Sequence, residues 1–256
     1  MEYIASFSGG KDSTATIILA HEHNEPLDKI IFSEVMFDKN ISGELPEHID
    51  FILNKCKPLF EGWGYEVKIL HSEYTYMDCF NHITTRSRKP ERNGKRNGFP
   101  MAGRCIINDR CKIKPIKDFI KTKDPKQITQ YLGIAIDEPK RLERLKDEKT
   151  IRISLLEKYR YTEKMAYELC EKYNLLSPTY DFAPRGGCWF CPNARYCELK
   201  HLRTYHRDLW QKLLDLEKEP DLIGNIWNTL QKRSMADNEE KFRLEDAQMT
   251  IFDFIQ

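Results

Sequence analysis

The segment Ser8–Ser13, with the sequence SGGKDS, carries residue types that bind a phosphate group. Glycines let backbone N–H groups approach an anion, and a helix start adds unpaired donors and the positive end of the helix dipole. Ser8 and Ser13 add hydroxyl donors, and Lys11 adds a positive charge. The spacing is not the G-x-x-x-x-G-K-S/T of a Walker A loop. The alternative is a tight strand-to-helix turn with a serine or aspartate N-cap.

The spacing Cys188-x2-Cys191-x5-Cys197 is the second signal of chemistry, and it lies in a chain with 8 cysteines. In a reducing compartment, clustered cysteines indicate metal or redox chemistry rather than disulfides. The turn RGGCWFCP is flexible enough to let two thiolates face one ion. His201 follows Cys197 by one helical turn and would complete a Cys3His zinc site. A buried aromatic turn with free thiols is the alternative.

Residues 86–104, RSRKPERNGKRNGFPMAGR, form a basic segment rich in glycine and proline. One interpretation is a solvated insertion. The other is a flap that closes over phosphates or binds a nucleic-acid backbone through its lysines and arginines.

Strands and helices must position these segments, and the sequence predicts that they alternate. The predicted strands are 3–7, 29–37, 65–70 and 128–136, and the predicted helices are 12–23, 46–63 and 111–123. This alternation implies right-handed crossovers and a parallel sheet with helices on both faces, an α/β fold of the Rossmann-like kind. Ligands of such sheets bind beyond the carboxyl ends of the strands. The segment Ser8–Ser13 follows the first of these strands.

Length and composition set the class of protein. The chain has 256 residues, 32% of them charged, and a net charge of +1, so any basic surface must be local. No apolar run of roughly 18 residues and no signal segment is present, and we expect a cytoplasmic protein without membrane contact. We expect an α/β nucleotide-binding domain at 1–155, a helical cysteine-containing region at 156–247 and a tail at 248–256.

The chain resembles the PP-loop ATP pyrophosphatase superfamily, in its phosphoadenosine phosphosulfate (PAPS) reductase-like branch. The resemblance is carried by SGGKDS after a first strand, by Asp38 after the second, and by the segments CKIKP, LGIAIDEPKR and RGGCWFCP. It implies the adenine nucleotide alpha hydrolase fold, with ATP or an adenylyl sulfate and Mg²⁺ at the loop. Lys11, Asp12 and Asp38 would be catalytic, and Asp38 would lie close to the nucleotide. The phosphate cradle would be Ser8, Gly9, Gly10, Lys11, Asp12 and Ser13.

The segment GIAIDEPKR resembles the G-I-R-x-D-E-x-x-R pattern of the same branch. Gly133 lies near a strand end, where a missing side chain permits close approach of a ligand or backbone. Asp137, Glu138 and Arg141 would orient Mg²⁺ or the substrate. An ordinary solvated turn with Asp137 as a helix cap is the alternative. Ala135 stands where the family pattern often has arginine, so the function of that side chain is lost.

The cysteines also resemble those of this superfamily. In adenylyl-sulfate reductases, cysteines before a K-x-x-P segment join a later C-x-x-C around a [4Fe–4S] cluster, and here Cys105 and Cys111 flank that place. Sulfurtransferases of DNA phosphorothioation carry a similar C-x2-C-x5-C with a cluster. The ligands would come from Cys105, Cys111, Cys188, Cys191 and Cys197. Four thiolates suit zinc or a cluster, and the resemblance favours the cluster.

The reductases proper use a cysteine in a C-terminal tail to attack the sulfonate. This chain has no cysteine after Cys197, so a substrate adenylated at the loop fits better. We expect an enzyme of sulfur transfer or activation that uses ATP or an adenylyl sulfate, with nucleic acid as one candidate acceptor. The alternatives are a PAPS reductase relative with an external reductant, and a nucleic-acid-binding module with structural zinc, regulated by nucleotide and without turnover.

The chain ends in EDAQMTIFDFIQ. Gln248, Ile251 and Phe252 resemble the short peptide by which bacterial and phage proteins bind the DNA sliding clamp. The alternative is a terminal helix or strand that packs Phe252 and Phe254 on its own domain.

Overall fold

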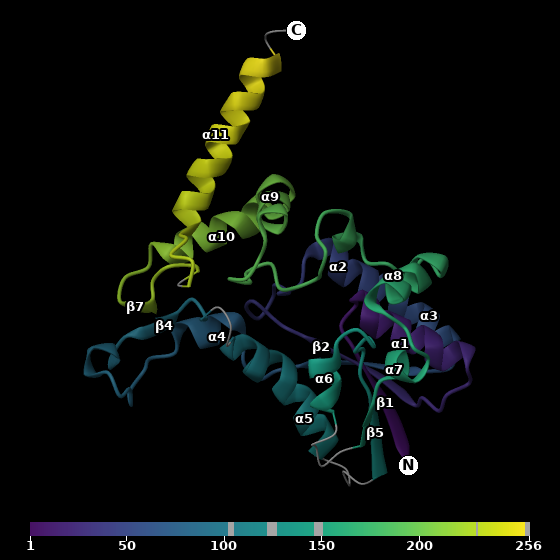
Figure 1. Ribbon diagram of the computed structural model, residues 1–256. Helices are drawn as coiled ribbons and strands as arrows, with labels where there is room; N and C mark the ends of the chain where they lie inside the picture. The colour runs from purple at the N-terminus through teal and green to yellow at the C-terminus, as the bar shows by residue number, and fades with distance from the viewer. Residues whose placement is uncertain (102–104, 122–126, 146–150, 229, 254–256) are drawn as a thin grey trace.

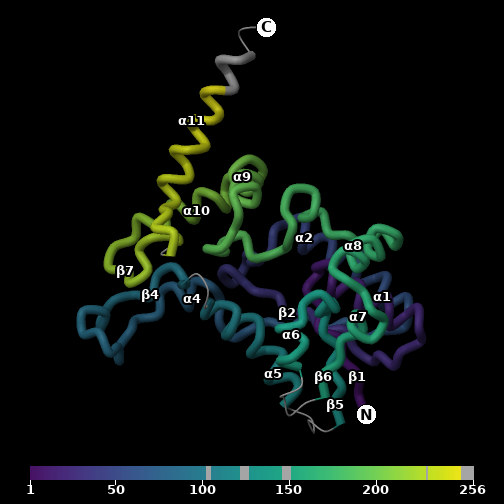
Figure 2. Tube along the Cα trace, viewed as in Figure 1, coloured from purple at the N-terminus to yellow at the C-terminus, as the bar shows by residue number. Residues whose placement is uncertain are grey.

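A computed structural model shows how these segments are arranged (Figures 1 and 2). It describes residues 1–101, 105–121, 127–145, 151–228 and 230–253, and for 249–253 the backbone alone.

The centre of the described structure is a parallel β-sheet of five strands. In spatial order the strands are β3 (Glu66–His71), β2 (Lys29–Glu34), β1 (Glu2–Phe7), β5 (Ile128–Tyr131) and β6 (Ile151–Ile153). Strands β1 and β2 contribute apolar residues to both faces of the sheet, as is typical of parallel strands covered by helices. The predicted α/β fold with a parallel sheet is confirmed.

Both faces of the sheet are covered, because successive side chains of a strand point to opposite faces. Ala5 and Phe7 of β1 belong to a large core shared with α1 (Lys11–Glu22), α3 (Lys57–Gly62), α7 (Leu155–Lys158) and α8 (Glu163–Lys172). Ile4 of β1 belongs to a smaller core on the other face, where it packs with residues of α5 (Lys114–Lys121).

The remaining elements lie between and beyond these helices. They are α2 (Pro46–Asp50) and a π-helical segment η1 (Phe51–Cys56), both continuous with α3, then α4 (Tyr76–Asn81), the 3-10 turn η2 (Pro90–Arg92), the π-helical segment η3 (Asn108–Ile113) before α5, α6 (Pro139–Glu143), the 3-10 turn η5 (Pro178–Asp181), α9 (Tyr196–Tyr205), α10 (Arg207–Glu217) and α11 (Met235–Asp253). Strands β4 (Arg96–Gly98) and β7 (Leu222–Gly224) form a separate parallel pair.

Most predicted elements occur with shifted ends. Strand β2 stops at Glu34 because the chain turns back, with the Gly43 amide donating to the Val35 carbonyl at 2.6 Å. Strand β5 stops at Tyr131, earlier than the predicted 136. Strand β6 was not predicted from the sequence, and at 3 residues it is too short to leave a periodic pattern.

A second core lies beside the sheet domain, and it contains Trp189, Trp210 and Trp227. Both halves of the chain contribute to it, from Val35 to Phe242. The first core in turn includes residues of α7 and α8, which follow residue 155. A boundary at residue 155 therefore does not separate the two cores.

The middle of the basic segment extends away from the cores, and so does the end of the C-terminal helix beyond Phe242. The chain between α4 and β4 projects at one end of the molecule, and residues 88–95 are exposed (Figure 1). Helix α11 projects with the C-terminus at its tip (Figure 1). Gln248 is exposed on α11, whereas the side chains of 249–256 lie outside the described residues. None of the helices described has the length and apolar character needed to cross a membrane.

Candidate functional site

Strands β1 and β5 are neighbours in the middle of the sheet, with Ala5 in register with Tyr131. From β1 the chain passes to β2 and β3 on one side, and it continues later in β5 and β6 on the other. The connections that follow the two central strands therefore leave in opposite directions. Open α/β sheets bind ligands at this switch point, beyond the carboxyl ends of the strands. The segment Ser8–Ser13 leaves β1 at this place.

The loop backbone is held by its own side chains. Gly9 has a φ of +71°, a left-handed conformation that favours glycine. The Ser13 hydroxyl donates to the Gly10 carbonyl at 2.9 Å, and its oxygen lies 3.2 Å from the Ser8 amide nitrogen, which donates to it. Helix α1 begins after Gly10, which offers no side-chain cap, so the alternative with a serine or aspartate N-cap does not apply. The Tyr180 hydroxyl accepts the first helical amide hydrogen, that of Lys11. Unpaired amides at a helix start are groups of the kind that bind anions.

His48 of α2 supports the loop and was missed by the sequence analysis. Its imidazole is buried, with Nε2 at 3.1 Å from the Ser8 carbonyl oxygen and Nδ1 at 2.7 Å from the Ser177 hydroxyl. A Cβ atom on Gly9 would lie 2.6 Å from its Cε1 atom. The imidazole therefore fixes the loop from the side of α2. A lone histidine in a predicted helix carries no signal of such a contact.

Gly133, which follows β5, contacts the start of α1. A Cβ atom on Gly133 would lie 2.6 Å from the carbonyl carbon of Asp12 and 2.6 Å from the amide nitrogen of Ser13. Real Cβ atoms do not approach backbone so closely, so only glycine fits without moving the loop. The structure thus brings together two segments that the sequence analysis selected separately.

We expect Gly133→Ala to weaken binding of ATP about 10- to 100-fold, because displacing packed backbone costs about 1–3 kcal/mol. Isothermal titration calorimetry measures this change. Gly62→Ala is the matched control, since a Cβ atom on Gly62 would meet nothing within 4 Å and should leave the affinity unchanged. Equal affinities of the two variants would contradict a nucleotide site at this contact.

Lys11 is the cation of the site. Its ammonium lies 2.9 Å from Asp12 and 3.2 Å from Glu163, with 13% of the side chain exposed. Burial lowers the pKa of Lys11, but the hydrogen bonds and charges of Asp12 and Glu163 raise it by more, and the net pKa is above the ordinary value. Burial and the carboxylates of Glu163 and Glu138 raise the pKa of Asp12, against the opposing effect of Lys11. The Lys11 ammonium therefore lies among several carboxylates.

Tyr180 of η5 lies against the same loop. Its hydroxyl accepts the Lys11 amide hydrogen at 2.9 Å. Lys11 and Tyr180 line one cavity of about 430 Å³, whose other walls are Tyr167, Phe182, Ala183 and Pro184. We call this the Lys11 cavity. The aromatic walls beside a lysine suit an adenine nucleotide, because rings can stack while the ammonium meets phosphates.

Asp137 lies close to the same lysine. A second cavity, of about 560 Å³, is lined by Lys11, Asp137 and Glu163, together with residues of α8. The Asp137 carboxylate accepts the Glu163 amide hydrogen at 3.1 Å, at the start of α8. Arg141 is held by Glu138, with Nη1 at 2.8 Å from a carboxylate oxygen. The carboxylates of Asp137 and Glu163 are oxygen donors of the kind that Mg²⁺ prefers.

Asp38 organises its own turn. Its carboxylate accepts hydrogens from the amides of Asn40 and Ile41 at 2.8 and 2.9 Å. These are its hydrogen bonds within the part of the chain that the structure describes, so Asp38 contacts its turn rather than the loop Ser8–Ser13. The expectation that it lies near the nucleotide stays a prediction.

Four of the cysteines belong to the second core, namely Cys79, Cys105, Cys111 and Cys188. Cys188 and Cys191 form a turn closed by a hydrogen bond of 2.9 Å from the Cys191 amide to the Cys188 carbonyl. Burial raises the pKa of Cys188 well above its usual value, and the charges of Cys191 and Cys105 add to it. A hydrogen bond with Cys79, burial and the neighbouring Cys188 and Cys105 raise the pKa of Cys111. The thiols of 105, 111 and 188 therefore lie near enough to act on one another, as do those of 188 and 191, but no three of the described cysteine thiols lie within 4.8 Å of one another.

Cys79 of α4 was not selected from the sequence. The Cys111 thiol donates a hydrogen bond to it, which, against the effect of burial and with help from Arg110, lowers the pKa of Cys79 to about 7. Cys79 is isolated in the sequence, so only the contact with Cys111 associates it with the other cysteines.

Cys197 and His201 lie elsewhere, on α9. Together with Phe182 they line a cavity of about 400 Å³, and Cys197 is the only described cysteine in its lining. His201 Nε2 lies 2.6 Å from a carboxylate oxygen of Glu47, not beside Cys188 or Cys191. Of the alternatives for completing the cysteine site, Cys105 and Cys111 lie near enough to Cys188 for their charges to interact, whereas His201 pairs with Glu47. The ligand set stays a prediction.

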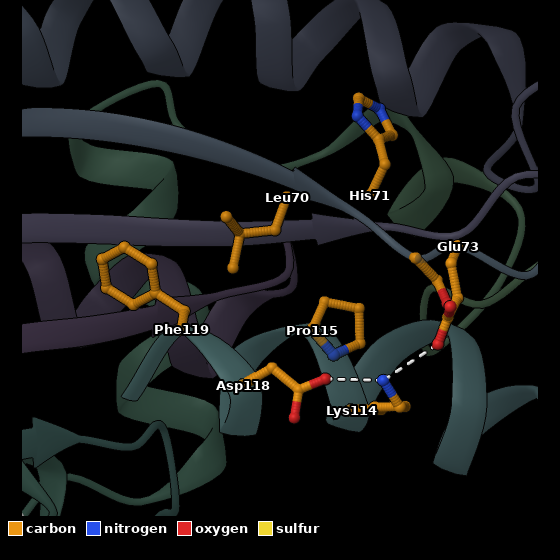
Figure 3. Close-up of a pocket in the computed structure, with 8 residues that line it drawn as sticks. Leu70, His71, Glu73, Lys114, Pro115, Asp118 and Phe119 are labelled. Carbon is orange, nitrogen blue, oxygen red and sulfur yellow. Dashed lines mark hydrogen bonds and ion pairs between the residues drawn. The ribbon is translucent and has the colours of Figure 1, made fainter. Parts of the chain in front are cut away.

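A further cavity, of about 460 Å³, lies between the end of β3 and helix α5 (Figure 3). Its lysine, Lys114, pairs with Asp118 at 2.6 Å and with Glu73 at 3.1 Å. The Lys114 side chain is 47% exposed and that of Lys11 is 13% exposed, so solvent screens the Lys114 charge more and this cavity attracts an anion less than the Lys11 cavity does.

No protein-family model matched the chain, and neither did any curated protein.

Proposed function

We propose that the chain is a PP-loop enzyme that binds ATP or an adenylyl sulfate and acts in sulfur transfer or activation by adenylating a substrate. The observation that carries the proposal is the contact of Gly133 with the backbone of Asp12 and Ser13, at the switch point of the sheet. A glycine from the neighbouring strand end is needed there only because the loop approaches so closely. This is the arrangement that a loop for phosphates requires.

The chemistry follows from the charges around Lys11. Loop amides at the start of α1 would hold the phosphates, and the Lys11 ammonium would stabilise the charge that develops on departing pyrophosphate. The carboxylates of Asp12, Asp137 and Glu163 would repel the phosphates unless a cation lay between them. Mg²⁺ fits this donor set and would neutralise the leaving group.

Cysteines 105, 111, 188 and 191 are proposed as the ligands of a metal centre. Their chemistry fits zinc and a [4Fe–4S] cluster alike, since each takes four thiolates. The buried environment of Cys188 and Cys111 disfavours charged thiolates without a cation. Bound zinc would stabilise the fold, whereas a bound cluster would supply electron-transfer or sulfur chemistry. Absorbance near 400 nm after anaerobic purification would identify the cluster, and a colourless protein with stoichiometric zinc would identify zinc.

The test of the nucleotide activity is the fate of ATP with Mg²⁺. AMP and pyrophosphate are the expected products, separated by ion-exchange chromatography from ADP and phosphate. Products of β–γ cleavage, or the absence of any binding of ATP and adenylyl sulfate in calorimetry, would contradict the proposal.

Nucleic acid is the proposed acceptor because the basic segment projects into solvent at residues 88–95. Replacement of Arg88, Lys89, Arg92 and Lys95 by glutamine should weaken RNA binding and reduce the slope of log K against log salt by about 0.7 for each phosphate that the protein no longer neutralises. Filter binding over a range of salt concentrations measures both. The control replaces four exposed lysines elsewhere, namely Lys121, Lys164, Lys172 and Lys218. Equal effects on RNA binding in both variants would exclude a specific basic segment.

A further inference from the structure

Three potential metal ligands meet between α2 and the junction of α9 with α10. Glu47 comes from α2, His201 from α9, and His206 from the residue between α9 and α10. One ligand atom of each lies within 4.8 Å of the other two. Among the described residues, this is the one group of three or more His, Cys, Asp and Glu side chains that meets that distance.

The contacts within the group have the arrangement of a ligand set. Nε2 of His201 lies 2.6 Å from one carboxylate oxygen of Glu47, and Nε2 of His206 lies 2.9 Å from the other. Around a tetrahedral zinc ion with bonds of about 2.0–2.1 Å, ligand atoms are about 3.3 Å apart. Small side-chain rotations would therefore open the group enough to admit an ion.

Two atoms of the group lack hydrogen-bond partners. The Glu47 Oε2 and His206 Nε2 atoms are buried, face one another at 2.9 Å without hydrogen-bond geometry, and have no hydrogen bond to any other described group. Buried polar atoms are normally paired, because an unpaired one loses its hydration without compensation. An ion bound to both atoms would remove this deficit.

The surroundings hold the group in place. The ring of His201 stacks on Phe182, with centroids 3.6 Å apart and planes 5° from parallel. The side chains of His201 and His206 are each 17% exposed, and that of Glu47 is 24% exposed. The group is therefore largely buried and orientated by packing, which reduces the entropy lost when a ligand orders it.

We propose that Glu47, His201 and His206 bind a divalent transition-metal ion of the zinc type. Two imidazoles and one carboxylate form a set that suits such ions and leaves one coordination position open. This site is separate from the cysteine centre, and it joins α2 to the α9–α10 junction.

The proposed metal site lies next to residues that contact the loop Ser8–Ser13 and the Lys11 cavity. His48, the neighbour of Glu47, contacts the Ser8 carbonyl. Phe182, whose ring stacks on that of His201, also lines the Lys11 cavity. A metal that fixes Glu47 to His201 would therefore hold together two of the segments that surround the Lys11 cavity.

The test is the number of zinc ions bound per chain, measured by elemental analysis of tag-free protein after equilibrium dialysis against zinc. His201→Gln and His206→Gln should each bind one zinc fewer than the wild-type chain. Added zinc should raise the Tm of the wild-type chain by more than that of either variant, because an ion bound only to the folded state stabilises it. The difference in zinc content is independent of what the cysteines hold and of nucleotide turnover.

His71→Gln is the matched control. Nε2 of His71 lies 2.9 Å from Glu34, so it has the same imidazole–carboxylate contact but no second imidazole in a group of three. It should keep the wild-type zinc content. Glu47→Gln, which preserves the shape of the side chain, should lose the same single zinc and guards against misfolding of the histidine variants. Equal zinc content in the wild-type chain and in the folded variants of Glu47 and His206 would overturn the proposal.

Discussion

We expect Lys11→Ala to lower the proposed release of AMP and pyrophosphate from ATP by about 10²- to 10³-fold, the cost of removing a group that would stabilise charge in the transition state. The structure makes this loss large because the carboxylates of Asp12 and Glu163, which the ammonium now compensates, would remain beside the phosphates. Single-turnover assays with radiolabelled ATP would measure the rate. ATP affinity should fall as well, since charge repulsion acts in the bound ground state too.

Lys172→Ala is the control for this variant. Lys172 lies on α8, is 69% exposed and pairs with Glu22, so its removal also deletes one lysine near α1 but outside the Lys11 cavity. Its rate should equal that of the wild-type enzyme. A Lys11→Ala enzyme with wild-type turnover would show that the phosphates bind elsewhere.

Cys188→Ser should abolish stoichiometric metal binding at the cysteine centre and lower the Tm by about 10 °C or more. Loss of a metal site is one of the few mechanisms by which a single substitution costs more than about 4 kcal/mol, and each kcal/mol corresponds to about 2–4 °C in a chain of this size. The second core packs around this turn, with Trp189 and Phe190 buried within it, so the loss would spread to that core. Metal analysis and thermal unfolding by circular dichroism measure the two effects.

The Cys197→Ser variant tests which cysteines bind the metal of the proposed cysteine centre. Cys197 lines the α9 cavity with His201 and Phe182, so its replacement should leave the metal content of the cysteine centre unchanged. Loss of that metal in Cys197→Ser, with retention in Cys188→Ser, would exclude the thiols of 105, 111, 188 and 191 as the ligand set.

Local sequence was sufficient for the elements that bear the chemistry. The first strand, the glycine loop and helix α1 lie where the pattern predicts them, because an apolar run, two glycines and a helical repeat are encoded within about 20 consecutive residues. The continuous helix of α2, η1 and α3 was likewise predicted at 46–63 and observed at 46–62. Alternation of such elements also predicted the parallel sheet.

Contacts between distant residues could not be read from the sequence. Gly133 meets Asp12, His48 meets Ser8, and His201 meets Glu47 across a separation of 154 residues. Periodicity records which face of an element is buried, but it does not record which other element covers that face. The choice of Cys105 and Cys111 as neighbours of Cys188 therefore also depended on tertiary packing.

The sequence by itself determined the glycine loop between the first strand and helix α1 and the short spacing of Cys188, Cys191 and Cys197, because both depend on residue types that are close in the chain. Only the tertiary structure decided what surrounds them: the glycine after β5 that admits the loop, the carboxylates around Lys11, and the separation of His201 from the cysteine centre. The physical reason is that burial and close packing are properties of pairs of elements, and the strand order of the sheet sets which pairs meet.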